Sequence, residues 1–302
     1  MKATKLMAAL AVLALLVCLP ACAAGGATGT TSTAPNRTTA PPRTDEETAD
    51  TAYPDKTAGF QMEAPQKGEQ IAVLHTDCGD LYVRLFPEAA PLAVNNFIAL
   101  AQKGYYNGVT FHYIKQGDIV QTGDPTGTGE GGESATGEPF ADEFDTKLLN
   151  LYGSLAMASA DVDSNGSQFY INQKNAEGFG KREYYTPEYR EAAAKDLYNS
   201  ALEQVSAEEL KEKYGISDYK DFITDPYVYD WIPDEVWTAY EKHGGNVRLD
   251  GAFRREGGHT VFGQIFQGLD VLEDIANTVV DSNHKPVVKV CIKSIEITTY
   301  QG

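Results

Sequence analysis

The chain has 302 residues, of which 42% are hydrophobic and 23% are charged, values that are ordinary for a soluble globular protein. Acidic residues outnumber basic residues by 43 to 25, which gives a net charge of −18. A surface of this sign repels nucleic-acid phosphates and anionic lipid headgroups, so the composition argues against a nucleic-acid-binding protein.

The N-terminus has the parts of a bacterial export signal. A short positive region precedes an apolar stretch at residues 6–19, which is too short for a membrane span. The following Leu19-Pro20-Ala21-Cys22 looks like a lipobox, where bacterial lipoproteins are cut before a cysteine that carries diacylglycerol. We expect a signal peptide at residues 1–21 and a lipid on Cys22, which would anchor the protein to the cell membrane outside the cytoplasm. A plain secretory signal, with Cys22 incidental, is the alternative.

Residues 22–65 are rich in Thr, Ala and Pro and contain almost no large apolar side chains before Tyr53 and Phe60. Such a segment buries too little apolar surface to fold, so we expect a disordered tether. The folded domain is expected at residues 66–302. An extracytoplasmic location permits a disulfide between Cys78 and Cys291, but two cysteines so far apart do not require one.

Short strands dominate the first part of the folded region. Residues 71–75 and 81–86 are typical of a hairpin, with a turn at residues 76–80 between them. After Pro87 and Pro91, apolar residues at helical spacing predict a helix that ends near Gly104. Further strands are expected at residues 109–114, 119–122, 154–158 and 168–171, with a glycine-rich loop at 126–137.

Helical patterns appear between about residues 175 and 246. We expect helices at 188–214 and 233–242, and we interpret the segment as an insertion in the main domain rather than a second one. Its aromatic residues either pack the insertion against that domain or form a partner-binding face; they are Tyr227, Tyr229, Trp231, Trp237 and Tyr240. A strand at 259–265, a helix at 269–276 and a strand at 287–297 complete the chain. Many short strands with two isolated helices predict a closed antiparallel barrel capped at its ends.

Four segments carry the functional signal, and the first two of them place aromatic, amide and glycine residues where strands meet turns, as a pocket that grips a peptide requires. They read FHYIKQGDIVQTGD from Phe111, SLAMASADVDSNGSQFYI from Ser154, LDG from Leu249 and HTVFGQI from His259. Together they resemble the cyclophilins, a family of peptidyl-prolyl cis–trans isomerases, over residues 70–174 and 247–300. The resemblance implies the all-β fold class, with a closed eight-stranded antiparallel barrel capped by two helices.

The same resemblance implies an active site without a metal or a cofactor. Its catalytic residues would be Gln121, His259 and Tyr113. Its substrate-binding residues would be Ile119, Tyr170 and Leu249 around the proline ring, Gln168 on the substrate backbone, and Ala158 in the groove for the preceding residue. The expected partners are proline-containing peptides and unfolded exported proteins, and the expected state is a monomer.

Several positions depart from the family pattern. Tyr113 follows the Phe-His pair where the family usually has an arginine, and Ser159 stands where an asparagine is usual. Asp118 replaces a pocket phenylalanine, and Arg248 replaces a tryptophan or histidine. Because a hydrogen bond from a neutral hydroxyl is weaker than one from a guanidinium, Tyr113 predicts reduced turnover.

Two hypotheses follow from Tyr113. The protein is a working isomerase, or it is a weakly catalytic peptide-binding or chaperone module that keeps the pocket. Arg254 or Arg255, in a loop just before His259, would compensate if either side chain reached the pocket.

One segment imitates a metal site. Residues 161–166 resemble the first half of an EF-hand loop, but position twelve would be Asn172 instead of the bidentate glutamate that calcium requires. The histidines show no paired zinc spacing either, so no metal is expected.

Overall fold

The computed structural model describes residues 51–223, 229, 232–254 and 257–302. They fall into two compact units. The smaller unit includes residues 183–223 and 229, and the larger includes residues 51–182 and the described residues from 232 onward. Within these ranges, none of the helices combines the length and apolar character that a membrane span requires.

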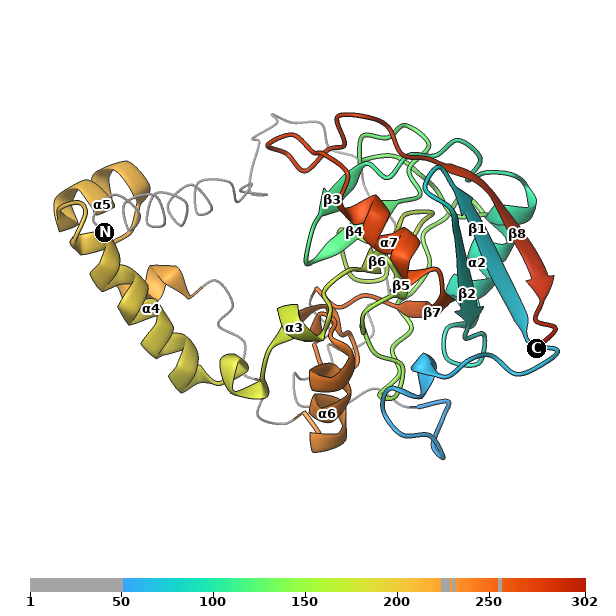
Figure 1. The fold of residues 1–302 in the computed structure, drawn as a ribbon, viewed down its shortest axis with the longest axis horizontal. Coiled ribbons are helices and arrows are strands. Elements are labelled where there is room, and N and C mark those ends of the chain that lie inside the picture. Colours follow the sequence, from blue (N-terminus) through green and yellow to red (C-terminus); the bar gives the residue numbers. More distant parts are fainter. Residues whose placement is uncertain (1–50, 224–228, 230–231, 255–256) are drawn as a thin grey trace, which may run out of the picture. The chain divides into compact units, whose positions relative to one another are not determined.

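The larger unit contains one antiparallel sheet whose strand order is β3-β4-β6-β5-β7-β2-β1-β8 (Figure 1). The strands are β1 (Gln70–Thr76), β2 (Asp80–Leu85), β3 (Tyr113–Lys115), β4 (Ile119–Thr122), β5 (Ser154–Met157), β6 (Phe169–Asn172), β7 (Val261–Gln267) and β8 (Ile292–Thr299). The fold class predicted from the sequence, an antiparallel eight-stranded sheet with helices, is therefore confirmed at this level.

The closure of the barrel was predicted wrongly. Strands β3 and β8 are the two edges of an open half-barrel. The chain beside these edges is joined by an isolated bridge between Thr110 and Cys291 and by single hydrogen bonds, such as that from Phe111 N to Val290 O at 2.9 Å. The main chain opposite β3 is a turn, in which His284 has φ 61° and its carbonyl accepts a hydrogen bond from Ile114 N at 2.8 Å. Because Pro286 follows in this turn and has no backbone N–H, the segment does not extend β8 into a closing strand.

Two helices pack against the sheet, α2 (Pro91–Gln102) and α7 (Leu269–Ala276). Phe97 of α2 lies in the main apolar core, with its ring centroid 5.6 Å from that of Phe169 and 5.2 Å from that of Phe262. In β2, buried and partly exposed residues alternate, as expected for a strand with one face on the core. Every residue of β5 and β6 is buried, so apolar side chains cover both faces of the sheet there.

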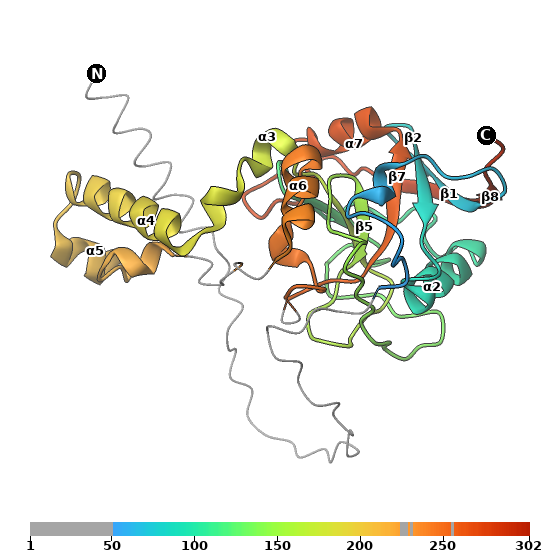
Figure 2. The same ribbon diagram turned by 90° about the horizontal axis from the view of Figure 1, so that it is seen from below.

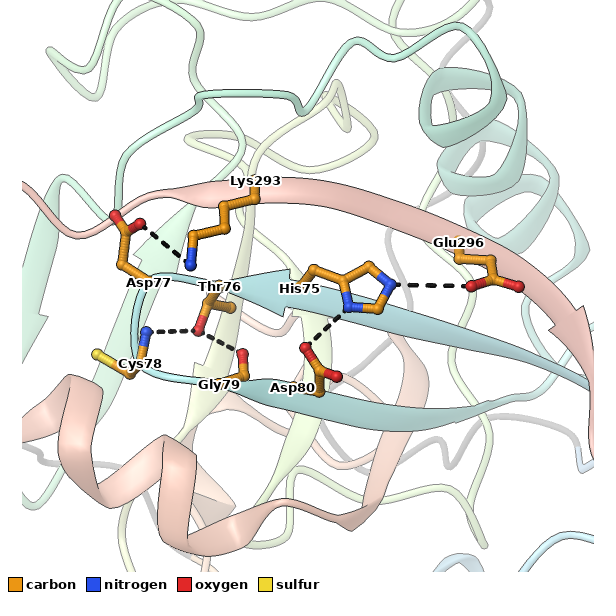
Figure 3. Close-up of polar contacts among 8 residues, drawn as sticks. All are labelled: His75, Thr76, Asp77, Cys78, Gly79, Asp80, Lys293 and Glu296. Atoms are coloured by element: carbon orange, nitrogen blue, oxygen red, sulfur yellow. Dashed lines mark hydrogen bonds and ion pairs between the residues drawn. The ribbon is translucent and has the colours of Figure 1, made fainter.

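The hairpin between β1 and β2 fixes the environment of Cys78 (Figure 3). Thr76 Oγ1 donates to the carbonyl of Gly79 and accepts a hydrogen bond from Cys78 N, which closes the turn. Asp77 N donates to Cys291 O at 3.1 Å, and Cys291 N donates to the Asp77 carboxylate at 2.9 Å. Because Asp77, and not Cys78, lies opposite Cys291, the two thiols remain free.

The chain before β1 is packed from residue 51 onward, although a disordered tether was expected up to residue 65. A 3-10 helix, η1 (Phe60–Met62), places Gln61 at 0% exposure. The Gln61 amide donates to Leu149 O at 2.8 Å and to Gln264 Oε1 at 2.9 Å, and Leu149 N donates back at 2.7 Å. Residues 51–65 therefore belong to the folded unit, which begins earlier than the predicted residue 66.

The insertion contains several short helices. They are α3 (Ala176–Phe179), η2 (Arg182–Tyr185), α4 (Pro187–Leu202), α5 (Ala207–Tyr214), η3 (Tyr219–Phe222) and α6 (Asp234–His243), followed by η4 (Val247–Leu249). The single helix expected at residues 188–214 is two helices, because the chain leaves helical geometry before Ser206 and the Ser206 side chain caps α5 by accepting a hydrogen bond from Glu209 N.

Residues 183–223 and 229 belong to the smaller compact unit, whereas we expected them to be part of the main domain. Their described residues have a separate apolar cluster of Ala194, Ala201, Leu210, Ile216 and Phe222. In contrast, α3 and α6 lie side by side in the larger unit (Figure 2).

The insertion aromatics are divided in the same way. Tyr229 is buried within the smaller unit, whereas Trp237 and Tyr240 of α6 are buried in the larger one. The ring of Phe179 in α3 stacks on Tyr240 at 5.3 Å. Tyr227 and Trp231 lie outside the described residues.

Candidate active site

One row of directly paired residues crosses five strands of the sheet. In order, the partners are Tyr113, Gln121, Tyr170, Ala156 and Val261. Directly opposed residues of an antiparallel sheet project from the same face, so all five side chains lie on one surface, which we name the site face.

An apolar cluster lies on the site face. Tyr170 is its buried centre, and Ile119, Ala158 and Leu249 pack around it while remaining partly exposed. His259 presents its ring edge-on to Tyr170, with centroids 5.3 Å apart and planes at 85°. The predicted pocket residues therefore lie together, from four separate segments of the chain, and form a surface that would accept a small apolar ring.

Two glutamine side chains form a polar pair beside this cluster. Gln121 Nε2 donates to Gln168 Oε1 at 2.9 Å. Gln168 Nε2 in turn donates to the carbonyls of Gly129 and Gly131, at 2.9 and 2.8 Å. Because an amide has two donor hydrogens and an acceptor oxygen, Gln121 keeps one N–H and its carbonyl oxygen for a ligand. Gln168 fixes the orientation of that amide.

The glycine-rich loop behind Gln168 is held by Asp124. This carboxylate accepts hydrogen bonds from the backbone N–H groups of Thr126, Thr128 and Gly129, at 2.8, 2.9 and 2.7 Å. Burial alone would raise the pKa of Asp124, but hydrogen bonds from Thr126 and from the loop backbone hold the pKa well below its usual range. Asp124 is therefore ionised at neutral pH and keeps the loop in position for Gln168.

His259 is neutral at physiological pH. Burial lowers its pKa to about 4, because a desolvated imidazolium is unfavourable, although a hydrogen bond with the Met157 backbone acts in the opposite direction. Its Nδ1 atom is buried and has no partner among the described residues. At neutral pH the His259 side chain is therefore uncharged, and its ring packs against Tyr170.

Tyr113 lies on the site face, opposite Gln121. Burial raises the pKa of its hydroxyl, so the group stays protonated and remains a hydrogen-bond donor over the whole neutral range. Its ring contacts His284 at 5.3 Å between centroids. Arg254 is half-buried, and its backbone N–H donates to Asp250 O at 2.9 Å, whereas Arg255 lies outside the described residues. A compensating arginine remains a prediction.

Asn150 is a positioning residue that the sequence did not reveal. Its Nδ2 donates to Leu249 O at 2.9 Å, while its Oδ1 accepts from Tyr170 OH at 2.6 Å and from Asn172 Nδ2 at 3.0 Å. One buried amide thus joins the two pocket residues Tyr170 and Leu249. No sequence motif marks Asn150, because its role depends on partners 20 and 99 positions away.

Asp250 stabilises the turn that carries Leu249. It is buried, accepts a hydrogen bond from Tyr240 OH at 2.6 Å, and pairs with His259 in an isolated parallel bridge. Burial raises the pKa of its carboxyl to about 7. The aspartate of the LDG segment is therefore structural, and it links the η4 turn to the segment that carries His259.

A pocket of about 210 Å³ adjoins His259, between residues 159–162 and 257–259. Its walls are the segment after Ala158 and the loop before His259. The pocket therefore lies on the side of the site face where the substrate residue before the proline is expected. Across the described ranges, His, Cys, Asp and Glu side chains form no group of three that could hold a metal ion. The site contains hydrogen-bond donors and apolar walls, which suffice for chemistry without bond cleavage.

Comparison with known proteins gives the same family that the motifs resemble. The family model for cyclophilin type peptidyl-prolyl cis-trans isomerases matches residues 71–186 and 242–297. A relative from Staphylococcus saprophyticus, named for peptidyl-prolyl cis-trans isomerase activity, is 39% identical over 238 residues, covering 78% of this chain and 96% of that protein. A Staphylococcus aureus relative with the same name is 38% identical over 232 residues, covering 77% and 93%.

Among solved structures, the chain is similar to a cyclophilin type peptidyl-prolyl cis-trans isomerase from Cryptosporidium parvum. The TM-score is 0.50 at 27% identity, covering 76% of this chain and 98% of that one. The matched regions contain all the paired residues of the site face and exclude most of the insertion. This chain belongs to the cyclophilin-type peptidyl-prolyl cis–trans isomerases.

Proposed function

We propose that this isomerase acts on X-Pro bonds of exported or surface proteins, as a monomer anchored outside the cytoplasm by a lipid on Cys22. The row of Tyr113, Gln121 and Tyr170 over an apolar cluster supports the activity. The lipobox-like segment at residues 19–22 supports the location. X-Pro isomerisation is slow enough to limit folding, so such an enzyme would speed the folding of exported chains.

The chemistry requires no nucleophile. Rotation about the amide is opposed by a barrier of roughly 18–20 kcal/mol, which arises from amide resonance. A site lowers it by binding the twisted amide better than either planar form. The apolar surface of Ile119, Tyr170 and Leu249 would receive the proline ring and fix it. The preceding carbonyl would then rotate against the free N–H of Gln121, whose orientation is set by Gln168.

The twisted state also develops a lone pair on the proline nitrogen. A donor directed at this nitrogen stabilises the twisted amide and not the planar one, so it acts on turnover more than on binding. We assign this role to Tyr113, because its hydroxyl remains protonated and can donate a hydrogen bond. A neutral donor supplies about half the strength of a charge-assisted one.

A peptide-binding module with little turnover is the second candidate function, because Tyr113 stands in the arginine position. NMR exchange on an Ala-Pro peptide measures both properties in one sample. We expect exchange catalysed by the wild-type protein and strongly reduced in Gln121→Ala, with Gln116→Ala, an exposed residue, as the control. Peptide chemical-shift changes without catalysed exchange would show the module instead.

The anchor is tested separately. Export of the full chain in a bacterial host with a labelled fatty acid should give a labelled, membrane-associated product. Cys22→Ser should abolish the label and release the protein, whereas Cys78→Ser should change neither. Labelling that persists in Cys22→Ser would contradict the proposed anchor.

A further inference from the structure

Charged side chains lie at the end of β4 that is away from Gln121. Lys115 Nζ lies 2.8 Å from Asp118 Oδ2, and Lys115 is directly opposite the pocket residue Ile119 in the β3–β4 pair. The carbonyl of Asp118 accepts a hydrogen bond from Gln173 N at 2.8 Å. This bond brings the next residue, Lys174, beside the same pocket edge.

Arg248 approaches from η4, immediately before the pocket residue Leu249. Gly245 N donates to Lys174 O at 2.8 Å, so the segment that leads into η4 runs beside Lys174. In the part of the chain that the structure describes, neither the Lys174 ammonium nor the Arg248 guanidinium has a hydrogen bond or an ion pair. We name Lys115, Lys174 and Arg248 the cation cluster.

The cation cluster contains three positive charges and is balanced by one carboxylate, Asp118. Burial lowers the pKa of Lys174, and the neighbouring Arg248 and Lys115 lower it further while Asp118 opposes them. Like charges that face one another at a partly buried site are unfavourable unless an anion joins them. This cluster is notable because the whole chain has a net charge of −18.

The register of the sheet gives the position of the cluster relative to a bound peptide. Along the chain, Gln121 lies two residues after Ile119, and Asp118 lies immediately before Ile119. Ala158 and Gln168, the expected contacts of the residue before proline, lie toward the Gln121 end, because Gln168 bonds to Gln121. A proline seated on Ile119 therefore directs the following residues toward the cation cluster.

We propose that the cation cluster binds an acidic side chain carried by the residues that follow the proline, so that the enzyme prefers X-Pro-Glu and X-Pro-Asp substrates. This inference rests on the proposed function. Asp118 and Arg248 stand where the family usually has aromatic residues, so the preference is a property of this chain and not of the fold.

Three peptides that differ only after the proline, Ala-Pro-Glu, Ala-Pro-Gln and Ala-Pro-Lys within one neutral frame, test the proposal. At low salt we expect kcat/KM and affinity to favour Glu over Lys by about three- to tenfold, and the ratio to shrink as salt is added. The net negative charge of the protein predicts the reverse order by long-range attraction, so the sign of the effect is decisive. Equal values for the Glu and Lys peptides, or a preference for Lys, would overturn the proposal.

Variants locate the effect. Arg248→Gln and Lys174→Gln should bring the Glu-to-Lys ratio close to one, and Arg248→Lys should preserve most of it. Lys67→Gln removes the same charge from an exposed turn and should leave the ratio unchanged. An equal loss in Lys67→Gln and Arg248→Gln would also contradict a local site. If no peptide is turned over, the proposed function fails, and the ratio of the three dissociation constants still decides the preference.

Discussion

Tyr113 lies directly opposite Gln121 in the β3–β4 pair, so the two side chains project side by side from the site face. This relationship predicts that Tyr113→Arg would place a guanidinium next to the Gln121 amide. A charge-assisted hydrogen bond to the twisted amide is roughly twice as strong as a neutral one, so we expect kcat to rise by about tenfold with little change in affinity. A protease-coupled assay on an Ala-Pro peptide measures the rate.

Tyr113→Phe completes this series by removing the donor and keeping the ring, and we expect a lower kcat. Tyr82→Phe, at a half-buried tyrosine of β2 far along the sheet, is the matched control. If Tyr113→Phe retains the wild-type kcat, the hydroxyl has no role in turnover, and a residue outside the row must supply the donor.

Gln168 offers a second prediction, because both ends of its amide are used. In Gln168→Glu a carboxylate would face the carbonyls of Gly129 and Gly131 without a hydrogen to donate. We expect a loss of about 1–3 kcal/mol in the free energy of unfolding, together with a lower kcat/KM as Gln121 loses its fixed orientation. Urea denaturation and the peptide assay measure the two effects. Unchanged values in both would show that the loop is held without Gln168.

Asp250 predicts a dependence of stability on pH. Its pKa is about 7 in the folded chain against a usual value of 3.8. Between these values the folded state keeps the proton and the unfolded state releases it, so this group lowers the free energy of unfolding as pH rises from about 4 to about 7. Asp250→Asn retains an acceptor for Tyr240 OH and should remove the loss, which is at most about 4 kcal/mol at pH 8.

His259 acts with the opposite sign over an overlapping interval. Its folded pKa, about 4, is below its usual value of 6.5, so its contribution to stability is present above pH 6.5 and is lost as pH falls toward 4. Asp250→Asn should therefore expose a loss of stability at acidic pH that the wild-type protein partly masks. Urea denaturation of both proteins at pH 4.5, 6 and 8 checks this, and parallel pH profiles of the two would contradict the assignment to Asp250.

Phe60 predicts how much the N-terminal segment stabilises the fold. Its side chain is 4% exposed, and its ring lies 4.6 Å from that of Tyr53 and 5.7 Å from that of Phe86. Phe60→Ala should lower the free energy of unfolding by about 3–5 kcal/mol, whereas Leu92→Ala, at a side chain that is 47% exposed, should cost less than about 1 kcal/mol. If the free energy of unfolding fell by a similar amount in the two variants, residues 51–65 would add no buried apolar packing to the fold.

The strands of the site face could be predicted from sequence, because aromatic, amide and glycine residues occur there at strand–turn positions. The role of Gln61 could not be predicted in the same way. Its hydrogen bonds join it to residues 88 and 203 positions further along the chain, and no local pattern encodes partners at that distance. The sparse apolar residues around it therefore indicated a tether, although two of them, Tyr53 and Phe60, are enough to pack the segment.

The open edge of the sheet was missed for a related reason. Residues 287–297 have strand character throughout, but the pairing of a strand depends on what lies beside it, and the chain opposite β3 is the turn at His284. The helix expected at 188–214 is interrupted between Leu202 and Ala207. There the Ser206 side chain caps α5 with a single hydrogen bond, which competes with continuation of the helix. In both places the sequence indicated the right type of element, a strand or a helix, but predicted an element longer than the one in the structure.

The hydrogen bond from Gly245 N to Lys174 O has a consequence for how such a chain can change over generations. It closes the base of the insertion, and the stacked rings of Phe179 and Tyr240 hold the two ends next to it. A loop whose ends are already joined tolerates added length cheaply, since each doubling costs only about 0.6 kcal/mol. Among the helices beyond this closure, α4 and α5 can therefore be lengthened, replaced or lost at little cost in closure free energy, whereas α6 is constrained because its Tyr240 donates a hydrogen bond to the buried Asp250.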